Sequence, residues 1–509
     1  MSGVRSRPMG APPPARDLPG RTRPLLRVLA LLGIASATIG VRSPAYAQDP
    51  EPEPPSVLLV LTDDQRWDTL WAMPEVQRLL AEPGVTFSNA FTTSPLCCPA
   101  RASILTGGYP HTTGVYTQGR PHGGFEAFDD STTIATELDR AGYDTGFFGK
   151  YLDSFQADAL SGYVPPGWDR FVAFVHAQYF AYQLTFDGRI ASYGDERGDY
   201  STDVLADQAE DFLRTASGPV FAVFAPAAPH APALPPREDR QLFADLPTWR
   251  PPSFDEADRD DKPTHMRALR PLGDERIADL DALRQNQYRS LQAVDRAVER
   301  LVQALEETGR LDNAVIVFTS DNGLLWGEHG WMKKEVPYDE AIRIPLVIRA
   351  DALAVPHDDG HLVANIDLAP TVAEVAGVEL PDADGQSLAP LLRGEEVRWR
   401  PAVLIEHVRG TNPIPTYCAV RTPRYLFARY STGEVELYDL QTDPAQLENV
   451  ARRRPEVEAR LETALQGLCV PAPPGFSRGP GIVVTLLALA VTLGVGALAR
   501  IGLAPWAHG

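Results

Sequence analysis

Continuous runs of β-branched and aliphatic residues, separated by helical segments, constrain the fold of this chain more than any other feature. A run that is apolar at every position is typical of a strand buried on both faces of a parallel sheet. Such runs lie at 56–62, 220–224, 315–319 and 345–348. Segments 203–213 and 288–305 carry apolar residues at the spacing of an amphipathic helix. We therefore predict an α/β body with a mainly parallel sheet flanked by helices, which binds its ligand at the carboxyl ends of the strands.

The pattern changes after about residue 395. Short strand-like runs with turn residues between them occupy 402–405, 417–420 and 434–438, and a helical segment follows near 456–468. Closely spaced short strands are typical of an antiparallel sheet. We predict a large α/β domain over 48–395, which would carry the functional site, and a smaller C-terminal antiparallel α+β unit over 396–470.

The N-terminal segment differs from the body in composition. Residues 1–27 are rich in Arg and Pro, an apolar stretch follows at 28–41, and Ala45-Tyr46-Ala47 has the small-residue pattern of a cleavage site. This order predicts a secretory signal peptide over 1–47. A membrane anchor is the alternative, although the apolar run is short for a span.

The C-terminal segment is also apolar. Residues 482–499 carry no charge, residues 471–481 before them form a Pro/Gly-containing linker, and 500–509 form a short tail. Eighteen apolar residues suffice to cross a bilayer, whereas a surface helix would show a polar face. A buried core helix is the alternative. We predict an exported, cell-surface protein anchored in the membrane by a C-terminal transmembrane helix, with its tail inside.

Charge and cysteine content exclude several classes of function. The chain has 47 basic and 67 acidic residues, a formal net charge of −20, which argues against nucleic acid as a partner. An anionic substrate must therefore be held by a local cluster of cations. The four cysteines are too few for a disulfide-dense scaffold. Cys418 and Cys469 could form a disulfide or remain as two buried thiols.

Polar residues follow three of the predicted strands. Asp63-Asp64 comes after the first, Asp321-Asn322 after the 315–319 strand, and His230 shortly after the 220–224 strand. Carboxylates and a side-chain carbonyl that converge at strand ends suit a hard divalent cation such as Ca²⁺ or Mg²⁺. Taken alone, each pair could also be a turn or helix cap.

The segment 97–107 carries the most specific pattern. Pro99 suits the first turn of a helix and Gly107 suits its end. Cys97 would then lie at the helix N-terminus, where backbone N–H groups favour an anion, with Arg101 one turn further on. A buried cysteine pair is the alternative, with Cys98 as a core residue.

These residues resemble the sulfatase family, whose signature is C-x-P-x-R followed by a short helix that ends in T-G. Further matches follow in order along the body. They are Asp63-Asp64, Gly149-Lys150, His230, Asp321-Asn322-Gly323, His329 with Lys334, Arg343-x-Pro345, 367–371 and 384–388. The segments 96–99, 149–152 and 228–232 look most like the N-acetylglucosamine-6-sulfatase and extracellular endosulfatase branch. The resemblance implies an alkaline-phosphatase-like fold and a sulfated carbohydrate as substrate.

The resemblance also implies roles for individual residues. Cys97 would be converted by a formylglycine-generating enzyme to formylglycine, whose hydrated form attacks sulfur. The cation, Ca²⁺ in preference to Mg²⁺, would be held by a set of five residues: Asp63, Asp64, Cys97 in its modified form, Asp321 and Asn322. Lys150, Lys334 and His230 would neutralise charge on the sulfate oxygens. Arg101 would hold the gem-diol, and His230 would protonate the leaving oxygen.

One position departs from the family pattern. Many sulfatases carry a His two residues after the lysine of the G-K motif, and this chain has Leu152 there. Asp153, His111 and His122 are candidates for the missing base. Two rival functions remain: hydrolysis of phosphate or phosphonate esters on the same fold, and a catalytically idle surface protein that binds sulfated glycans.

Overall fold

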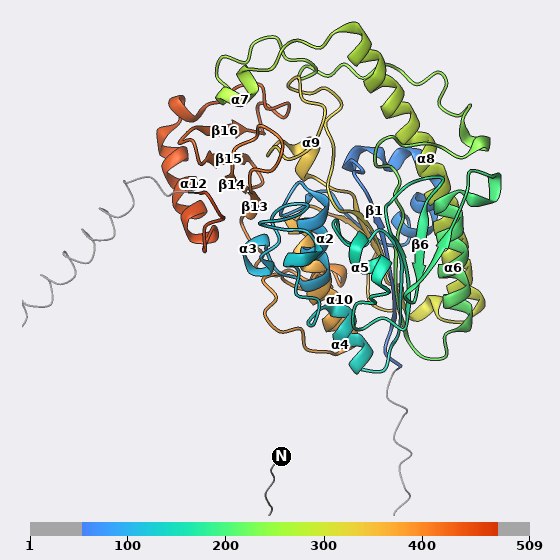
Figure 1. Cartoon of the computed structure of the whole chain (residues 1–509). Coiled ribbons are helices and arrows are strands. Elements are labelled where there is room, and N and C mark those ends of the chain that lie inside the picture. The colour runs from blue at the N-terminus through green and yellow to red at the C-terminus, as the bar shows by residue number, and fades with distance from the viewer. Residues whose placement is uncertain (1–52, 477–509) are drawn as a thin grey trace, which may run out of the picture. The chain divides into compact units, whose positions relative to one another are not determined.

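A ten-stranded sheet forms the centre of the computed structural model, which describes residues 53–476 (Figure 1). Its strand order is β11-β2-β10-β9-β1-β8-β4-β5-β6-β7. The strands are β1 (Ser56–Thr62), β2 (Val85–Phe87), β4 (Asp144–Gly149), β5 (Arg170–Phe174), β6 (Gln183–Phe186), β7 (Arg189–Ser192), β8 (Val220–Ala225), β9 (Ala314–Ser320), β10 (Leu346–Arg349) and β11 (His357–Asp359). Two further strands, β3 (Ala90–Phe91) and β12 (Val363–Ala364), pair separately.

The middle of the sheet is parallel, as the sequence predicts. Strand β1 pairs in parallel with β9 on one side and β8 on the other, and β4 and β5 continue the parallel part. The predicted strand at 345–348 is present as β10, but it runs antiparallel to β9. The connection from β9 returns through a loop and the short helix α9 (Asp339–Ile342) rather than through a crossover helix, so the chain re-enters the sheet in the opposite direction.

Helices cover both faces of the sheet, because successive strand residues point to opposite sides. Val57, Leu59 and Leu61 pack in one apolar core, on the side of α2 (Cys97–Thr106), α4 (Ile134–Arg140) and α10 (Leu368–Ala376). Leu58 and Val60 pack in the other, on the side of α6 (Ser201–Thr215) and α8 (Asp274–Glu307) (Figure 1). This confirms the predicted α/β fold. Helix α8 begins well before the predicted segment. The sequence pattern missed its first turns because they are largely exposed and lack the apolar period.

The remaining helices are short connectors. They are α1 (Pro74–Val76), α3 (Pro110–Thr113), α5 (Gln156–Ser161), α7 (Thr264–Arg267) and α11 (Ala389–Leu392).

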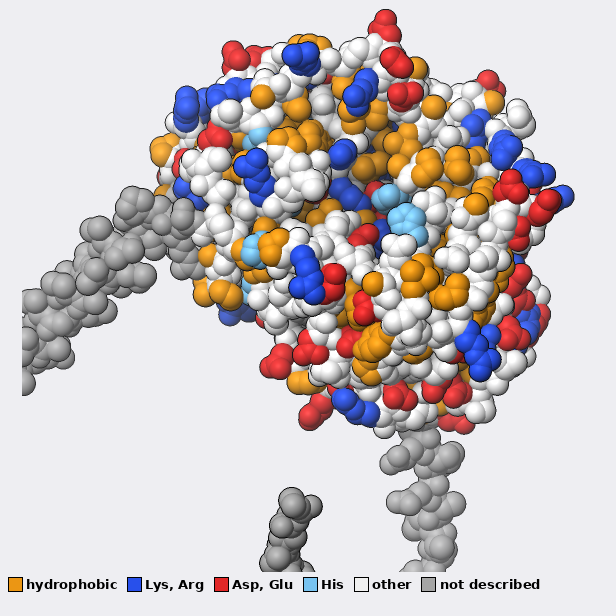
Figure 2. Space-filling view, in the orientation of Figure 1, with side chains coloured by type: hydrophobic (Ala, Val, Ile, Leu, Met, Phe, Trp, Pro, Cys, Tyr) orange, Lys and Arg blue, Asp and Glu red, His pale blue; other side chains and the backbone are white. Residues whose placement is uncertain are grey.

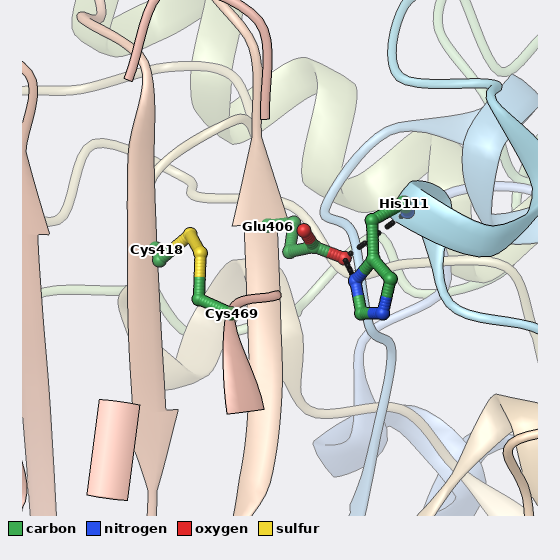
Figure 3. The surroundings of a disulfide bond; sticks show 4 residues. All are labelled: His111, Glu406, Cys418 and Cys469. Carbon is green, nitrogen blue, oxygen red and sulfur yellow. Dashed lines mark hydrogen bonds and ion pairs between the residues drawn. A yellow bond between two sulfur atoms is a disulfide. The ribbon is translucent and has the colours of Figure 1, made fainter. Parts of the chain in front are cut away.

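A four-stranded antiparallel sheet follows in the C-terminal part, as predicted. Its strands are β13 (Val403–His407), β14 (Tyr417–Arg421), β15 (Tyr425–Tyr430) and β16 (Val435–Asp439), and α12 (Pro455–Leu468) packs on it. The sequence patterns did not predict β15. The opposite face shares an apolar core with Phe91, Tyr338 and Ile342 of the body. A disulfide joins Cys418 of β14 to Cys469 at the end of α12 (Figure 3). The division at residue 395 stays a prediction.

The predictions for the chain ends fall outside this part of the structure. The signal peptide at 1–47, the span at 482–499 and the tail at 500–509 lie beyond the described residues, as does most of the 471–481 linker. Along residues 53–476, no helix is both long and apolar enough to cross a membrane.

Candidate active site

Strands β1 and β9 bring the acidic residues together. Because Thr62 pairs with Ser320 in parallel register, the residues that follow each strand leave the sheet side by side. The Asp321 N–H donates to the Thr62 carbonyl at 3.2 Å, and the Asp64 N–H donates to Asp321 Oδ1 at 3.1 Å. Asp63, Asp64, Asp321 and Asn322 are all buried.

Cys97 is the first residue of α2, and its sulfur faces these carboxylates. Its Sγ lies 3.3 Å from Asp63 Oδ1 and 3.9 Å from Asp64 Oδ1. Helix α2 ends at Gly107, which has a φ of 75° and packs against Pro370 and Ala383. The start and end of the helix are therefore as the sequence predicts.

Four basic side chains surround the acidic group. Arg101 Nε donates to Asp321 Oδ2 at 2.8 Å, and Lys150 Nζ donates to Asp63 Oδ2 at 2.6 Å. Lys334 Nζ donates to Asp64 and lies 2.7 Å from the Cys97 sulfur. His230 Nε2 lies 3.8 Å from Asp64 Oδ2.

The structure thus gathers in one place the residues predicted to hold the cation, residue 97 and the sulfate, while the roles of these residues stay predictions. Lys334 reaches the site, whereas the adjacent Lys333 contacts Asn412 at 3.3 Å on the surface.

The donor set fits a divalent cation. Oxygen or sulfur atoms of Asp63, Asp64, Cys97 and Asp321 all lie within 4.8 Å of one another. Asn322 uses its Nδ2 to donate to Asp64 Oδ1 at 2.6 Å, and its buried Oδ1 has no hydrogen-bond partner among the described residues. Buried polar atoms normally have a partner, so an orphaned carbonyl oxygen beside three carboxylates points to a hard cation as its ligand.

The pKa values of the carboxylates reflect the same crowding of charge. Burial alone would raise the pKa of Asp63, but the charges of Lys150, His230 and other nearby basic groups hold it well below its ordinary value. Burial and the neighbouring Asp63 raise the pKa of Asp321. Two carboxylates this close resist joint ionisation unless a cation joins them.

Cys97 is a poor nucleophile as a thiol. Burial, and then the charge of Asp63, raise its pKa well above the ordinary value of 9.0. The thiolate is the reactive form, so an unmodified Cys97 stays protonated near neutral pH. The geometry therefore suits a residue that does not depend on a thiolate.

A pocket of about 450 Å³ opens beside the acidic group. Its lining includes Asp63, Lys150 and His230, and also side chains that no sequence motif singled out. Those additional polar residues are Gln118, Gln156, His176, Gln178 and Tyr179. Figure 2 shows His side chains beside basic and acidic ones in a hollow on this face of the molecule.

The structure separates the three candidates for the missing base. Leu152 belongs to the apolar core and also lines the pocket, where it offers no polar group. Asp153 lines the pocket, whereas His111 and His122 are not among its lining residues. His111 instead bonds to Glu406 of β13 at 2.8 Å (Figure 3).

His329, which matches a family position, is buried between Glu256 and Tyr338. Its Nδ1 bonds to Glu256 at 2.7 Å, and its ring stacks on Tyr338. The sequence could not reveal Glu256 as its partner, because the two residues are 73 positions apart. Gln118 was also missed; its Oε1 accepts the Cys98 N–H at 3.0 Å and so caps the start of α2.

Comparison with known proteins agrees with this geometry. The sulfatase family model matches residues 55–378, and the model "N-sulphoglucosamine sulphohydrolase, C-terminal" matches residues 327–469. Human N-acetylglucosamine-6-sulfatase is 33% identical, over 92% of each chain. A Drosophila melanogaster extracellular sulfatase SULF-1 homolog is 36% identical over 69% of this chain, which spans only 33% of that protein.

Solved structures show the same fold. A structure in complex with its substrate D-glucosamine-2-N,6-O-disulfate superposes with a TM-score of 0.73 at 23% identity, covering 82% of this chain and 98% of that one. The phosphonate monoester hydrolase of Agrobacterium radiobacter gives 0.66 at 24% identity, covering 81% and 95%.

The chain therefore belongs to the sulfatase family and is a sulfatase enzyme. Relatives that match over most of both chains include N-acetylglucosamine-6-sulfatases and, at 30% identity, an arylsulfatase of Volvox carteri. Enzymes of this family generally use a formylglycine and a divalent cation.

Proposed function

We propose that this enzyme hydrolyses a sulfate ester of a glucosamine-type sugar, using Cys97 in its formylglycine form and a divalent cation, Ca²⁺ in preference to Mg²⁺. One observation carries the proposal: the Cys97 side chain is held between Asp63 and Lys334, at 3.3 Å and 2.7 Å. The Cys97 sulfur stands in for the hydroxyl oxygens of the hydrated aldehyde. The hydrated aldehyde would supply a nucleophilic hydroxyl, and the cation, when bound, would supply a positive charge that neutralises the sulfate.

Asp63, Asp64, Asp321 and Asn322 would hold the cation together with residue 97. The basic residues would then act on the substrate and on residue 97. Lys150 and Lys334 offer ammonium groups to the sulfate oxygens, where negative charge builds. Arg101, fixed by Asp321 and by the Lys150 carbonyl at 2.6 Å, orients the side chain of residue 97.

His230 is the proton donor to the leaving oxygen in this proposal. Its Nδ1 lies 2.7 Å from the Ala231 carbonyl, so that nitrogen carries a proton and the ring orientation is fixed. Its Nε2 faces Asp64 at 3.8 Å and lines the pocket, where the sugar oxygen would leave.

The sugar class rests on two supports. The relatives that match over most of both chains include N-acetylglucosamine-6-sulfatases beside arylsulfatases, and the pocket beside Lys150 is lined by amides, imidazoles and carboxylates that suit a polar ring. We also propose export. The Cys418–Cys469 disulfide suits an oxidising compartment, and one relative is named an extracellular sulfatase. Maturation would need a formylglycine-generating enzyme. The C-terminal anchor stays a prediction.

Mass spectrometry of the tryptic peptide 79–101 tests the nucleophile, in protein made with a formylglycine-generating enzyme. An aldehyde at position 97, and turnover that the Cys97→Ala variant loses while its unfolding curve is unchanged, are expected. An unmodified thiol in active protein, or normal turnover by Cys97→Ala, would refute the mechanism. Faster cleavage of an aryl phosphonate than of the matching aryl sulfate would favour the phosphonate rival.

A further inference from the structure

We propose that Asp153 makes the pocket selective for sugars that carry a single sulfate, because it excludes a second anionic substituent and favours a hydrogen-bond donor in its place. The inference rests on the proposed function. It concerns the part of the sugar that lies away from the sulfate being removed, and it assigns Asp153 a role in specificity rather than that of the missing base.

One carboxylate oxygen of Asp153 lacks a hydrogen-bond donor within the part of the chain that the structure describes. This atom, Oδ2, is buried, although the residue lines the pocket. An unpaired buried carboxylate oxygen is costly, since each lone pair that leaves water needs a donor. The residue itself is half-buried and lines the pocket, so its carboxylate forms part of the wall that a bound sugar contacts.

The backbone holds Asp153 rigidly in this position. Its carbonyl accepts the Phe125 N–H at 2.8 Å, and the next side chain, Ser154, donates to the Gln118 carbonyl at 2.9 Å. Tyr151 and Phe155 on either side belong to a packed aromatic group. The side chain is therefore presented by a fixed segment, which is what selective binding requires.

The charge balance of the pocket opposes a second anion. Among its lining residues Lys150 is the one Lys or Arg, and its ammonium already donates to Asp63 at 2.6 Å. A second sulfate would find no uncommitted Lys or Arg there and would lie near the Asp153 carboxylate.

A hydroxyl, amide or ammonium group would instead satisfy Asp153. A sugar with an N-acetyl or free amino group offers an N–H donor, whereas an N-sulfate brings charge of the wrong sign. A site that leaves a buried polar group unpaired with the wrong substrate discriminates strongly against it. The fold neighbour solved with D-glucosamine-2-N,6-O-disulfate supplies the comparison ligand for a test.

The test compares kcat/KM for N-acetylglucosamine-6-sulfate and for D-glucosamine-2-N,6-O-disulfate. We expect the wild-type enzyme to prefer the first by about tenfold or more, and Asp153→Asn to reduce this ratio about tenfold, chiefly through the KM of the disulfate. Asp139→Asn, an equal change of charge at an exposed site on α4, should leave the ratio unchanged. Equal use of both sugars by the wild type, or an unchanged ratio in Asp153→Asn, would overturn the inference.

Two further measurements separate this inference from the proposed function. Nitrophenyl sulfate reports sulfatase chemistry without a sugar, so its cleavage without cleavage of either sugar would refute the sugar pocket alone. No cleavage of any sulfate would refute the proposed function. In that case calorimetry measures the binding of the two sugars to the Cys97→Ala variant, with and without Asp153→Asn. Loss of the preference for N-acetylglucosamine-6-sulfate in the double variant would support the role of Asp153. Binding of neither sugar would contradict that role.

Discussion

Two groups of buried carboxylates in this molecule are built on opposite principles. In the C-terminal sheet, Glu436 of β16 is buried and accepts hydrogen bonds from three tyrosine hydroxyls at 2.5 to 2.7 Å. The donors are Tyr338, Tyr430 and Tyr438. A buried carboxylate with its oxygens satisfied by neutral donors is stable within an apolar core and helps to specify its packing.

At the strand ends of the large sheet, the carboxylates face one another. Asp63 and Asp321 are close enough for each to influence the other's ionisation, and the neighbouring Asn322 Oδ1 is left without a partner among the described residues. Basic side chains donate to all three carboxylates, and the Asn322 carbonyl oxygen is the atom left for a ligand. The comparison teaches that neutral donors suffice for a lone structural carboxylate, whereas carboxylates crowded together with charged donors and an orphaned carbonyl oxygen mark a cation site.

The largest effect should follow from changing the clustered carboxylates at the strand ends. Asp321→Asn should lower kcat/KM at least about a hundredfold, because the cation loses a carboxylate ligand and Arg101 loses its charged hydrogen-bond partner. In cation-free protein the same change should alter the free energy of unfolding by only about 1 kcal/mol, since it also relieves repulsion with Asp63. Kinetics, metal analysis and urea unfolding test this, with the exposed Asp312→Asn as control. Unchanged cation content would remove Asp321 from the ligand set.

The saturated group should respond in the opposite way. Glu436→Gln should lower the free energy of unfolding by about 2–3 kcal/mol, because an amide NH₂ replaces an acceptor and leaves at least one tyrosine hydroxyl mismatched. Catalysis at the strand ends of the large sheet should change by less than about twofold, since Glu436 bonds to tyrosines and not to the site residues named above. Denaturant unfolding and kcat/KM measured on the same preparation give both values. A large loss of activity at unchanged stability would contradict the distinction between the two groups.

Much of the large sheet and its site could be predicted from the sequence, and the reason is physical. Strands β1, β8 and β9 are buried on both faces, so their sequences are almost continuously apolar or β-branched, and Asp63 and Asp321 follow the ends of β1 and β9. The C-x-P-x-R segment then added Cys97 and Arg101 through the family resemblance. Both features depend on neighbours in sequence, which a single chain displays directly.

The rest depends on contacts between distant segments. The Cys418–Cys469 pairing stayed open until the fold placed β14 beside α12. Glu436 resembles any polar residue of a half-buried strand, because two of its partners are reached only by tertiary packing and sheet pairing. The antiparallel direction of β10 likewise follows from how the connection returns, and no local pattern records it.

A third effect, of intermediate size, concerns a buried histidine in the C-terminal sheet. Burial lowers the pKa of His407 on β13 from 6.5 to about 3, aided by the nearby His265 and opposed by the Ile414 carbonyl. The unfolded chain therefore gains a proton below pH 6.5 that the native state refuses, so stability is present above that pH and is lost as the pH falls towards 3.

This loss should reach roughly 2 kcal/mol between pH 6.5 and pH 5. Replacing His407 with Leu should flatten that part of the stability profile, whereas His361→Gln, at a more exposed site, should not. Urea unfolding at several pH values measures the slope. A slope that persists in His407→Leu would show that other groups cause it.

The smallest effect gives the most direct test of saturation. Tyr430→Phe removes one hydroxyl from Glu436 and should cost about 1 kcal/mol of unfolding free energy, because the carboxylate loses a donor that water cannot replace. Tyr182 is an internal control: it is also buried, but its hydroxyl has no hydrogen-bond partner among the described residues. Removing that hydroxyl in Tyr182→Phe should leave stability unchanged or raise it, since an unpaired polar group leaves the core. Equal losses in the two variants would mean that the hydrogen bond to Glu436 contributes no more to stability than an unpaired buried hydroxyl.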